Sequence, residues 1–226
     1  FTENNQVRLL LNGDETYRTM LEDITSATKY ILVQFYIFRD DETGQRFKNA
    51  LVAKAREGVR VYFLYDNIGT KLKTEFLREL EDAGVKIQVF RGTKKLFRAP
   101  VQINFRNHRK LLIVDGRTVF TGGLNVGDDY LGKSGPWRDT HVRIEGPATL
   151  AAQVSFEKDW YWAKGKVADL DWVIDKNQRG EPALVMSTGP ADDIELCLLS
   201  HLSLVLSAKK RLWIGNPYFV PPEGFA

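Results

Sequence analysis

The sequence predicts an α/β fold in which a mixed β-sheet is flanked by helices on both faces. Its first 90 residues alternate β-branched and aromatic runs with segments of helical periodicity, a pattern typical of strands joined by helices. Further along, Asp115-Gly116 separates two apolar runs and predicts an antiparallel hairpin. The 226 residues are 43% hydrophobic and 27% charged, which suffices for a core and excludes a disordered chain.

Alternating elements fill the first 90 residues. Met20, Leu21 and Ile24 recur at helical spacing, and Gly58 and Gly84 stand where helices usually end. The runs between the helical segments have the composition of buried strands. We therefore expect a largely parallel sheet here, with strands at 7–11, 30–38, 59–65 and 85–90 and helices at 15–28, 45–57 and 72–83.

The pattern changes near residue 110. Asp-Gly is the strongest short-range hairpin signal, so the strands on either side of Asp115-Gly116 should pair with each other. The sheet should therefore be mixed. In chain order we expect strands at 110–114, 117–121 and 140–144, a helix from Gly146-Pro147 through Trp162, and a polar connector over 163–181.

After this connector the opening of the chain recurs. Tyr36 matches Tyr218 at an offset of 182 residues, and the hydrophobic pattern around them is similar. The repeat predicts a first domain over 1–181 and the start of a second, incomplete copy over 182–226. Within the second copy we expect a strand at 183–187, a helix at 194–207 and a strand at 211–220.

Positive charge gathers in one stretch. The formal net charge is only +3, but residues 91–114 hold seven basic side chains and no acid. Such a stretch could face phosphate, nucleic acid or an anionic membrane surface, or it could be an ordinary solvated loop. No apolar run approaches the roughly 18 residues of a membrane helix, so we expect the chain itself to be soluble. The basic residues are Arg91, Lys94, Lys95, Arg98, Arg106, Arg109 and Lys110.

The end of this stretch carries the residues suited to chemistry. His108 and Lys110 are two apart at the entry to an expected strand, so both should point to the same face. A neutral imidazole can attack phosphorus, and an ammonium can neutralise the non-bridging oxygens. Asn125 follows Gly122 and Gly123 and could add an amide donor to the same anion.

Two carboxylates are candidates to support His108. Asp115 lies seven residues further on, roughly 23 Å away along a straight strand, and is interpreted mainly as a hairpin residue. Asp139 precedes a strand and is the better candidate to accept the other ring N–H of His108, although it could also cap the strand or pair with Arg138. His141 and His201 are expected to be structural, and Cys197 is expected to be a core residue and not a reactive thiol. No metal site is expected from so few ligands.

These residues together resemble a known family. His108-x-Lys110-x4-Asp115 with a following Gly-Gly-x-Asn resembles the HKD motif of the phospholipase D superfamily. Further segments make nearly the whole chain similar to bacterial cardiolipin synthases. They are Asp66-Asn67-Ile68-Gly69, Gly122-Gly123-Leu124-Asn125-Val126-Gly127, Trp137-Arg138-Asp139-Thr140-His141-Val142-Arg143-Ile144-Glu145-Gly146-Pro147 and Asn216-Pro217-Tyr218-Phe219-Val220-Pro221.

The resemblance implies a covalent phosphohistidine route that uses no metal or other cofactor. His108 would be the nucleophile, Lys110 and Asn125 would hold the phosphate, and Asp115 would complete the motif. Asp139 falls where relatives carry an acid that orients the histidine. The family transfers a phosphatidyl group from one phosphatidylglycerol to another and releases glycerol. It is anchored in the bacterial cell membrane by amino-terminal helices, which we expect to lie outside this chain.

The resemblance also implies a second histidine. Members of this type join two HKD copies in one site, where one histidine attacks and the other protonates the leaving group. At the 182-residue offset the second histidine is expected near position 290, beyond Ala226. Because the chain also begins with Phe1 in place of Met, we expect a fragment that is inactive alone, unless a symmetric homodimer brings two His108 residues together.

Two other functions stay open. A phospholipase D-type phosphodiesterase or nuclease, active as an HKD dimer, would use the same chemistry, and the basic stretch suits DNA as well as lipid. The other alternative is a non-catalytic membrane- or nucleic-acid-binding module. The intact set of His108, Lys110 and Asn125 argues against that module.

Overall fold

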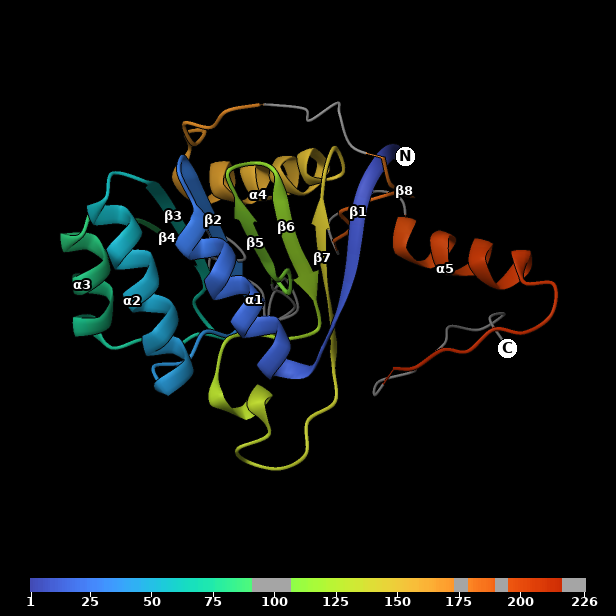
Figure 1. Cartoon of the computed structure of the whole chain (residues 1–226), viewed down its shortest axis with the longest axis horizontal. Helices are drawn as coiled ribbons and strands as arrows, with labels where there is room; N and C mark the ends of the chain where they lie inside the picture. The colour runs from blue at the N-terminus through green and yellow to red at the C-terminus, as the bar shows by residue number, and fades with distance from the viewer. Residues whose placement is uncertain (91–106, 173–178, 190–194, 217–226) are drawn as a thin grey trace, which may run out of the picture. The chain divides into compact units, whose positions relative to one another are not determined.

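A computed structural model describes residues 1–90, 107–172, 179–189 and 195–216 (Figure 1). The chain divides into two compact units, Phe1–Ser187 and Thr188–Ala226. The first unit contains the sheet, both of its helical layers and every candidate site residue, and it is described first.

One mixed sheet forms the centre of the first unit. Among the described residues it has eight strands, in the order β4-β3-β2-β5-β6-β7-β1-β8. β2, β3 and β4 run parallel, and the other neighbours are antiparallel, which confirms the predicted mixed sheet. The bounds are β1 Thr2–Leu11, β2 Tyr30–Phe35, β3 Arg60–Asp66, β4 Lys86–Phe90, β5 Leu111–Val114, β6 Thr118–Gly122, β7 Thr140–Glu145 and β8 Glu181–Ala183.

The first strand lies elsewhere than strand–helix alternation predicts. β1 pairs with β7 in antiparallel register, with Leu9 opposite Val142, so the expectation of a largely parallel arrangement is wrong for β1. Four inter-strand steps separate β1 from β2. At about 4.8 Å each they amount to about 19 Å. The connecting helix α1, Asn12–Ser26, is about 22 Å long at 1.5 Å per residue, enough to carry the chain across.

Helices cover both faces of the sheet, as the sequence predicts (Figure 1). On one face Met20, Leu51 and Leu80 belong to a core shared with the strands. On the opposite face Phe156 and Trp160 belong to a second core. The helices of the first face are α1, α2 Glu42–Arg56 and α3 Thr74–Asp82, and that of the second face is α4 Thr149–Lys164.

Part of the predicted connector packs on the same face as α4. Ala168 and Leu170 contact the second core, and the Tyr30 hydroxyl donates a hydrogen bond to the Asp171 carbonyl at 2.9 Å. The chain then reaches β8, which pairs with the start of β1. Residues 173–178 of the connector lie outside the described ranges.

The predicted hairpin is present. β5 and β6 pair up to Val114 and Thr118, and Asp115 and Gly116 both have positive φ, 53° and 67°. Two such residues form the turn whose twist matches paired strands, and glycine adopts this conformation without strain. β2 is shorter than predicted and ends at Phe35, because the following residues bond instead to Val126.

The second unit contains α5, Leu196–Ser207, within the predicted helix. Residues 211–216 form neither helix nor strand, so the strand predicted at 211–220 is wrong over this part, and its remaining residues are not described. A strand needs a neighbour for its backbone groups, and no described strand pairs with this segment. Cys197 is exposed, so the expectation that it is a core residue is wrong. No helix in the described ranges has the length and apolar character to cross a membrane.

Candidate active site

Four segments of the chain meet at one edge of the sheet. Leu111, which opens β5, lies opposite Gln34 near the end of β2 and opposite Thr121 near the end of β6. Gly122 at the end of β6 lies opposite His141 near the start of β7. The segments that follow β2 and β6 and precede β5 and β7 therefore share this edge, at the bottom of the sheet in Figure 1.

His108 and Lys110 lie against the same aromatic ring. The His108 imidazole stacks on Tyr36, with 4.0 Å between ring centroids and 18° between planes. The Lys110 ammonium lies 6.0 Å from the centroid of the Tyr36 ring and donates a hydrogen bond to the His108 carbonyl at 2.7 Å. The two side chains thus lie on one side of the chain, as their spacing predicts. Sequence reasoning did not assign Tyr36 to the site.

The electrostatics of Lys110 come from burial and from Asp139. Burial lowers the pKa of the Lys110 ammonium, and the negative charge of Asp139 opposes this shift. A partly dehydrated cation attracts an anion more strongly than a fully hydrated one. That Lys110 holds a phosphate oxygen beside His108 stays a prediction, with which this partial burial agrees.

Two glycines let the chain after β6 approach Asp139 and His141 closely. A Cβ on Gly123 would lie 2.2 Å from the Asp139 carboxylate, and one on Gly122 would lie 2.6 Å from Nδ1 of His141. Any larger residue would push the two segments apart. The Gly-Gly pair thus brings the end of β6 against the start of β7, beside Lys110.

Asp139 is held by its own strand and by the start of α1. Its carboxylate accepts a hydrogen bond from the Thr140 amide at 2.7 Å, and its backbone N–H donates to the Asn12 side chain at 3.2 Å. Arg138 donates to its carbonyl. These contacts resemble the strand-cap role considered from the sequence, while the carboxylate also acts on Lys110 by charge. A hydrogen bond from His108 to Asp139 stays a prediction.

Asn125 is buried, and its amide joins two of the segments that meet at this edge of the sheet. Its Oδ1 accepts from the backbone N–H of Ile37 at 2.9 Å, and its Nδ2 donates to the Tyr130 hydroxyl at 3.0 Å. Its carbonyl accepts from the Tyr17 hydroxyl. An amide carries two N–H donors. The described contacts engage one of them, which leaves the other for the predicted phosphate.

Asp115 lies at the opposite end of β5 from Lys110. Its carboxylate accepts hydrogen bonds from the backbone N–H groups of Thr28, Lys29 and Tyr30 and from the Thr28 hydroxyl, all at 2.8–3.0 Å. Burial alone would raise its pKa, but these bonds lower it below the ordinary value. The structure thus places Asp115 in the turn that fixes the hairpin to the start of β2, apart from the other four candidates.

His141, interpreted from the sequence as structural, is an addition to this edge. It is fully buried, and neither ring nitrogen has a hydrogen-bond partner among the described residues. Burial, together with the charge of Lys110, lowers the pKa of His141 to about 3, so the ring is neutral at physiological pH. Its position two residues after Asp139 is the signal that could have assigned it, since alternate strand residues share a face.

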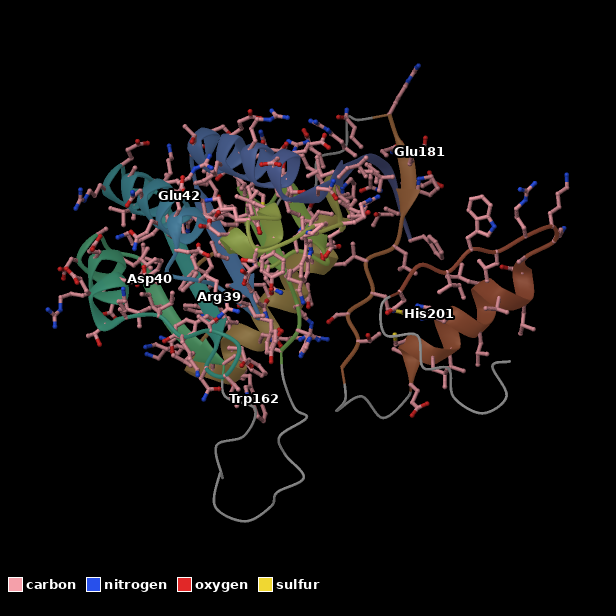
Figure 2. All side chains as sticks on the ribbon, turned by 90° about the horizontal axis from the view of Figure 1, so that it is seen from below. Arg39, Asp40, Glu42, Trp162, Glu181 and His201 are labelled. Carbon is pink, nitrogen blue, oxygen red and sulfur yellow. The ribbon has the colours of Figure 1, made fainter. Side chains whose placement is uncertain are left out.

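A cavity of about 360 Å³ opens on the same edge. Arg39, labelled in Figure 2 on the segment after β2, lines it together with Tyr130 and Trp137. The Tyr130 ring meets the Trp137 ring edge-on, with 5.0 Å between centroids. Because Tyr130 also bonds to Asn125, this cavity borders the candidate site.

Only part of the predicted basic stretch lies in the described residues. Arg109 and Lys110 of the basic stretch are described, whereas Arg91, Lys94, Lys95, Arg98 and Arg106 lie outside the described residues. Across the described ranges no cluster of three His, Cys, Asp or Glu side chains could hold a metal ion.

Comparison with known sequences gives a consistent match. Residues 20–160 match the family described as cardiolipin synthase, PLD-like domain, a range that contains all the candidate site residues. Cardiolipin synthase A of Pseudomonas fluorescens (strain Pf-5) is 43% identical over 224 residues, which cover 97% of this chain and 47% of that protein. Cardiolipin synthase A of Pseudomonas aeruginosa (strain PAO1) is 44% identical over 225 residues, 97% of this chain and 46% of that protein. The chain thus spans about half the length of these relatives.

Solved structures share the fold. Nuc of Salmonella typhimurium, a phospholipase D family member, superposes with a TM-score of 0.54 and 21% identity over 71% of this chain and 97% of that one. NucT of Helicobacter pylori superposes with a TM-score of 0.56 and 17% identity, and the match covers 70% of this chain and 98% of that one. The phosphatidylserine synthase of Haemophilus influenzae superposes with a TM-score of 0.52 and 19% identity, and the match covers 69% of this chain and 36% of that one. At these identities the likeness concerns the fold alone.

Proposed function

Because this chain belongs to the cardiolipin synthase family of phospholipase D-like proteins, we propose that the protein containing it is a phosphatidyltransferase that makes cardiolipin. Its donor and acceptor would both be phosphatidylglycerol. The observation that carries the proposal is the placement of His108 and Lys110 on one side of the chain against Tyr36, within the matched family region.

The proposed reaction has two displacements at phosphorus. In the first, a ring nitrogen of His108 forms a bond to phosphorus, and the bond from phosphorus to the oxygen of the headgroup glycerol breaks. An acid protonates that oxygen, and glycerol leaves. In the second, a hydroxyl of the acceptor lipid attacks phosphorus, loses its proton to the same group, and displaces His108. Each step breaks one phosphorus bond and forms another, so the phosphodiester is conserved.

The side chains around His108 have separate roles in this proposal. Lys110 neutralises the non-bridging oxygens, where charge develops during each displacement. Asn125 would donate its second amide N–H to the same oxygens. Tyr36 sets the plane of the His108 ring by stacking. Asp139 would stabilise the charge that develops on the imidazole.

The acid for the first step comes from a second HKD copy in this proposal. The first copy would cover residues 1–181, the second would begin at 182, and its histidine would lie near position 290. A homodimer that joins two His108 residues is the other arrangement that supplies two histidines. Symmetric dimers are the commonest homo-oligomers of soluble proteins.

The proposed substrate also sets the location of the protein. Phosphatidylglycerol is an anionic lipid of bacterial membranes, so the site must face a membrane surface, and we place the full protein at the bacterial cell membrane. The basic residues before His108 would face the anionic headgroups. Replacing Lys94, Lys95 and Arg98 by Ala should weaken binding to phosphatidylglycerol vesicles, and unchanged binding would contradict this orientation.

The test uses the full-length protein with phosphatidylglycerol vesicles and, in parallel, plasmid DNA. We expect cardiolipin and glycerol from the vesicles, and a phosphorylated His108 after acid-free trapping and mass spectrometry. The His108→Ala protein should give neither. Cleavage of DNA without cardiolipin formation would favour the nuclease, and full cardiolipin synthesis by His108→Ala would exclude catalysis at this site.

A further inference from the structure

Asp159 on α4 holds both residues that flank His108. Its carboxylate accepts hydrogen bonds from the Asn107 amide at 2.7 Å and from the Arg109 guanidinium at 2.7 and 3.0 Å. Gln34 of β2 donates to the same carboxylate at 2.7 Å. Asp159, Asn107 and Gln34 are all buried. This carboxylate is thus a buried junction between α4, β2 and the segment that carries His108.

Other hydrogen bonds fix the same segment. The side-chain oxygen of Asn107 accepts from the backbone N–H of Arg109 at 3.1 Å, which closes a turn around His108. The backbone N–H of Asn107 donates to the buried Asp66 carboxylate at 3.4 Å, and Lys110 donates to the His108 carbonyl. The backbone of His108 therefore cannot rotate without breaking bonds to buried groups, which is costly.

We propose that Asp159 is a positioning residue for His108. It holds Asn107 and Arg109, and thereby fixes the direction in which the imidazole leaves the backbone. The inference rests on the proposed function, in which His108 attacks phosphorus. Reacting groups must be held within roughly 0.5 Å of the productive geometry, and an error of about 1 Å can cost about 100-fold in rate.

The carboxylate suits this role because nothing else in its contacts can replace it. Asn107, Gln34 and Arg109 all present N–H groups to Asp159. Asn107 and Gln34 are buried, so loss of the carboxylate would weaken the bonds of these donors, and the segment should move until they find other partners. The movement would be passed directly to His108, which lies between two of the three.

A structural role for Asp159 must be separated from positioning, and the chain offers a matched control. Asp23 of α1 pairs with Arg143 of β7 at 2.8 Å, with side chains 18% and 22% exposed. The Asp159–Arg109 pair has the same form, at 2.7 Å with 11% and 28% exposed. Both pairs tie a helix to the sheet side of the fold, but only Asp159 bonds to the neighbours of His108.

The experiment compares Asp159→Asn and Asp23→Asn in the full-length protein. Turnover of phosphatidylglycerol vesicles and the rate of His108 phosphorylation are measured together with thermal unfolding. For Asp159→Asn we expect kcat to fall about 100-fold with KM nearly unchanged, because geometry at the nucleophile is lost while lipid binding is kept. Asp23→Asn should lose similar thermal stability and keep kcat.

A double variant tests the route through Arg109. If Asp159 acts by holding Arg109, then Asp159→Asn combined with Arg109→Gln should lose little more kcat than Asp159→Asn alone, since both changes remove the same link. Losses that multiply would overturn this route. A kcat for Asp159→Asn equal to that of Asp23→Asn would overturn the proposal.

A spectroscopic reading keeps the inference separate from the proposed function. The ring protons of His108 lie over Tyr36, so their NMR signals report the orientation of the imidazole. We expect these signals to shift in Asp159→Asn and to stay in place in Asp23→Asn. Unchanged signals in Asp159→Asn would overturn the positioning role. If the signals shift in Asp159→Asn as expected but the wild-type protein forms no phosphohistidine, only the proposed lipid chemistry is refuted.

Discussion

The ammonium of Lys110 lies in a partly buried position between a tyrosine ring, a backbone carbonyl and the charge of Asp139. None of these neighbours replaces a full hydration shell. An arriving phosphate would compensate this loss, so Lys110 should contribute more to the charged transition state than an exposed lysine would. The positive charge of Lys110 also acts on His141, a buried imidazole that has no hydrogen-bond partner in the described part of the chain.

Replacing Lys110 by Gln should lower the rate of His108 phosphorylation in the full-length protein by about 10²–10³-fold, because a charge aimed at the phosphoryl oxygens is lost. Lys86→Gln is the matched control, since Lys86 of β4 also lies over a tyrosine ring, Tyr62 at 4.7 Å. Rapid-quench measurement of the phosphorylated enzyme checks both. Equal rates in the two variants would contradict the role of Lys110.

His141 should make stability depend on pH. Its pKa is about 3 in the folded protein and about 6.5 in an unfolded chain, so between these values the unfolded state binds more protons. Stability should therefore fall as the pH drops below 6.5, with about 2 kcal/mol lost by pH 5. Denaturant unfolding of His141→Gln should show a flatter pH dependence.

The motif residues of the site could be predicted from the sequence, but their neighbours could not. His108 and Lys110 are two positions apart, so their common side follows from strand geometry. Tyr36 and Asp159 lie far from them in the chain, and only the pairing of β2 with β5 and the docking of α4 bring them close. Nothing in the local sequence around these two residues encodes that proximity.

At the scale of elements, the β5–β6 hairpin runs from the edge of the sheet that carries the candidate site to the opposite edge, where its turn lies. One end of β5 carries Lys110 and the other carries Asp115, whose carboxylate fixes the turn to the residues before β2. Because β2 also leads to Tyr36, the turn sets the register between the strand before Tyr36 and the strand after His108. A carboxylate distant from the chemistry can therefore influence it through register.

Asp115→Asn should destabilise the protein by about 1–2 kcal/mol at pH 7, because an amide offers one acceptor oxygen where the carboxylate offers two. Asn tolerates positive φ, so the turn itself is kept. The folded pKa of Asp115 is lowered, so its contribution is present above the unfolded value near 4 and is lost as the pH falls through the folded pKa. Wild-type and variant stabilities, measured by urea unfolding, should therefore converge as the pH falls below the unfolded value and through the folded pKa. A constant difference would contradict this account.

The type of an element, helix or strand, could be predicted where its sequence pattern is local. Which strands pair with each other could not. The Asp-Gly turn and the helical spacing of Met20 and Ile24 identify their elements directly. The location of β1 depends on which strand offers an open edge after the others have paired, a question of the whole sheet. The segment 211–216 has the composition of a strand, yet composition forms no ladder without a neighbour.

At the scale of the molecule, the chain covers about half of the curated relatives it matches. The first unit contains a complete sheet with two helical layers, while the described part of the second unit contains one helix with no buried residue. The candidate site residues all lie in the first unit. The division into two HKD copies and the role of His108 as nucleophile stay predictions.

The 226-residue chain should turn over phosphatidylglycerol about 10²–10⁴-fold more slowly than the full-length protein, since it would lack the general acid of the second copy. Sedimentation and turnover measured on the same sample check this. If the chain is active, it should sediment as a dimer. A monomer with the rate of the full-length protein would refute the two-histidine proposal.

The open side of β1 has a practical consequence for handling this chain. Among the described residues β8 pairs with β1 only at Thr2 and Asn5, and the rest of that side presents backbone groups beside the exposed Val7, Leu9 and Leu11. Such an edge can recruit other chains. When the chain is concentrated, association should therefore begin at the open side of β1. Leu9→Lys is the first substitution to make if the preparation precipitates.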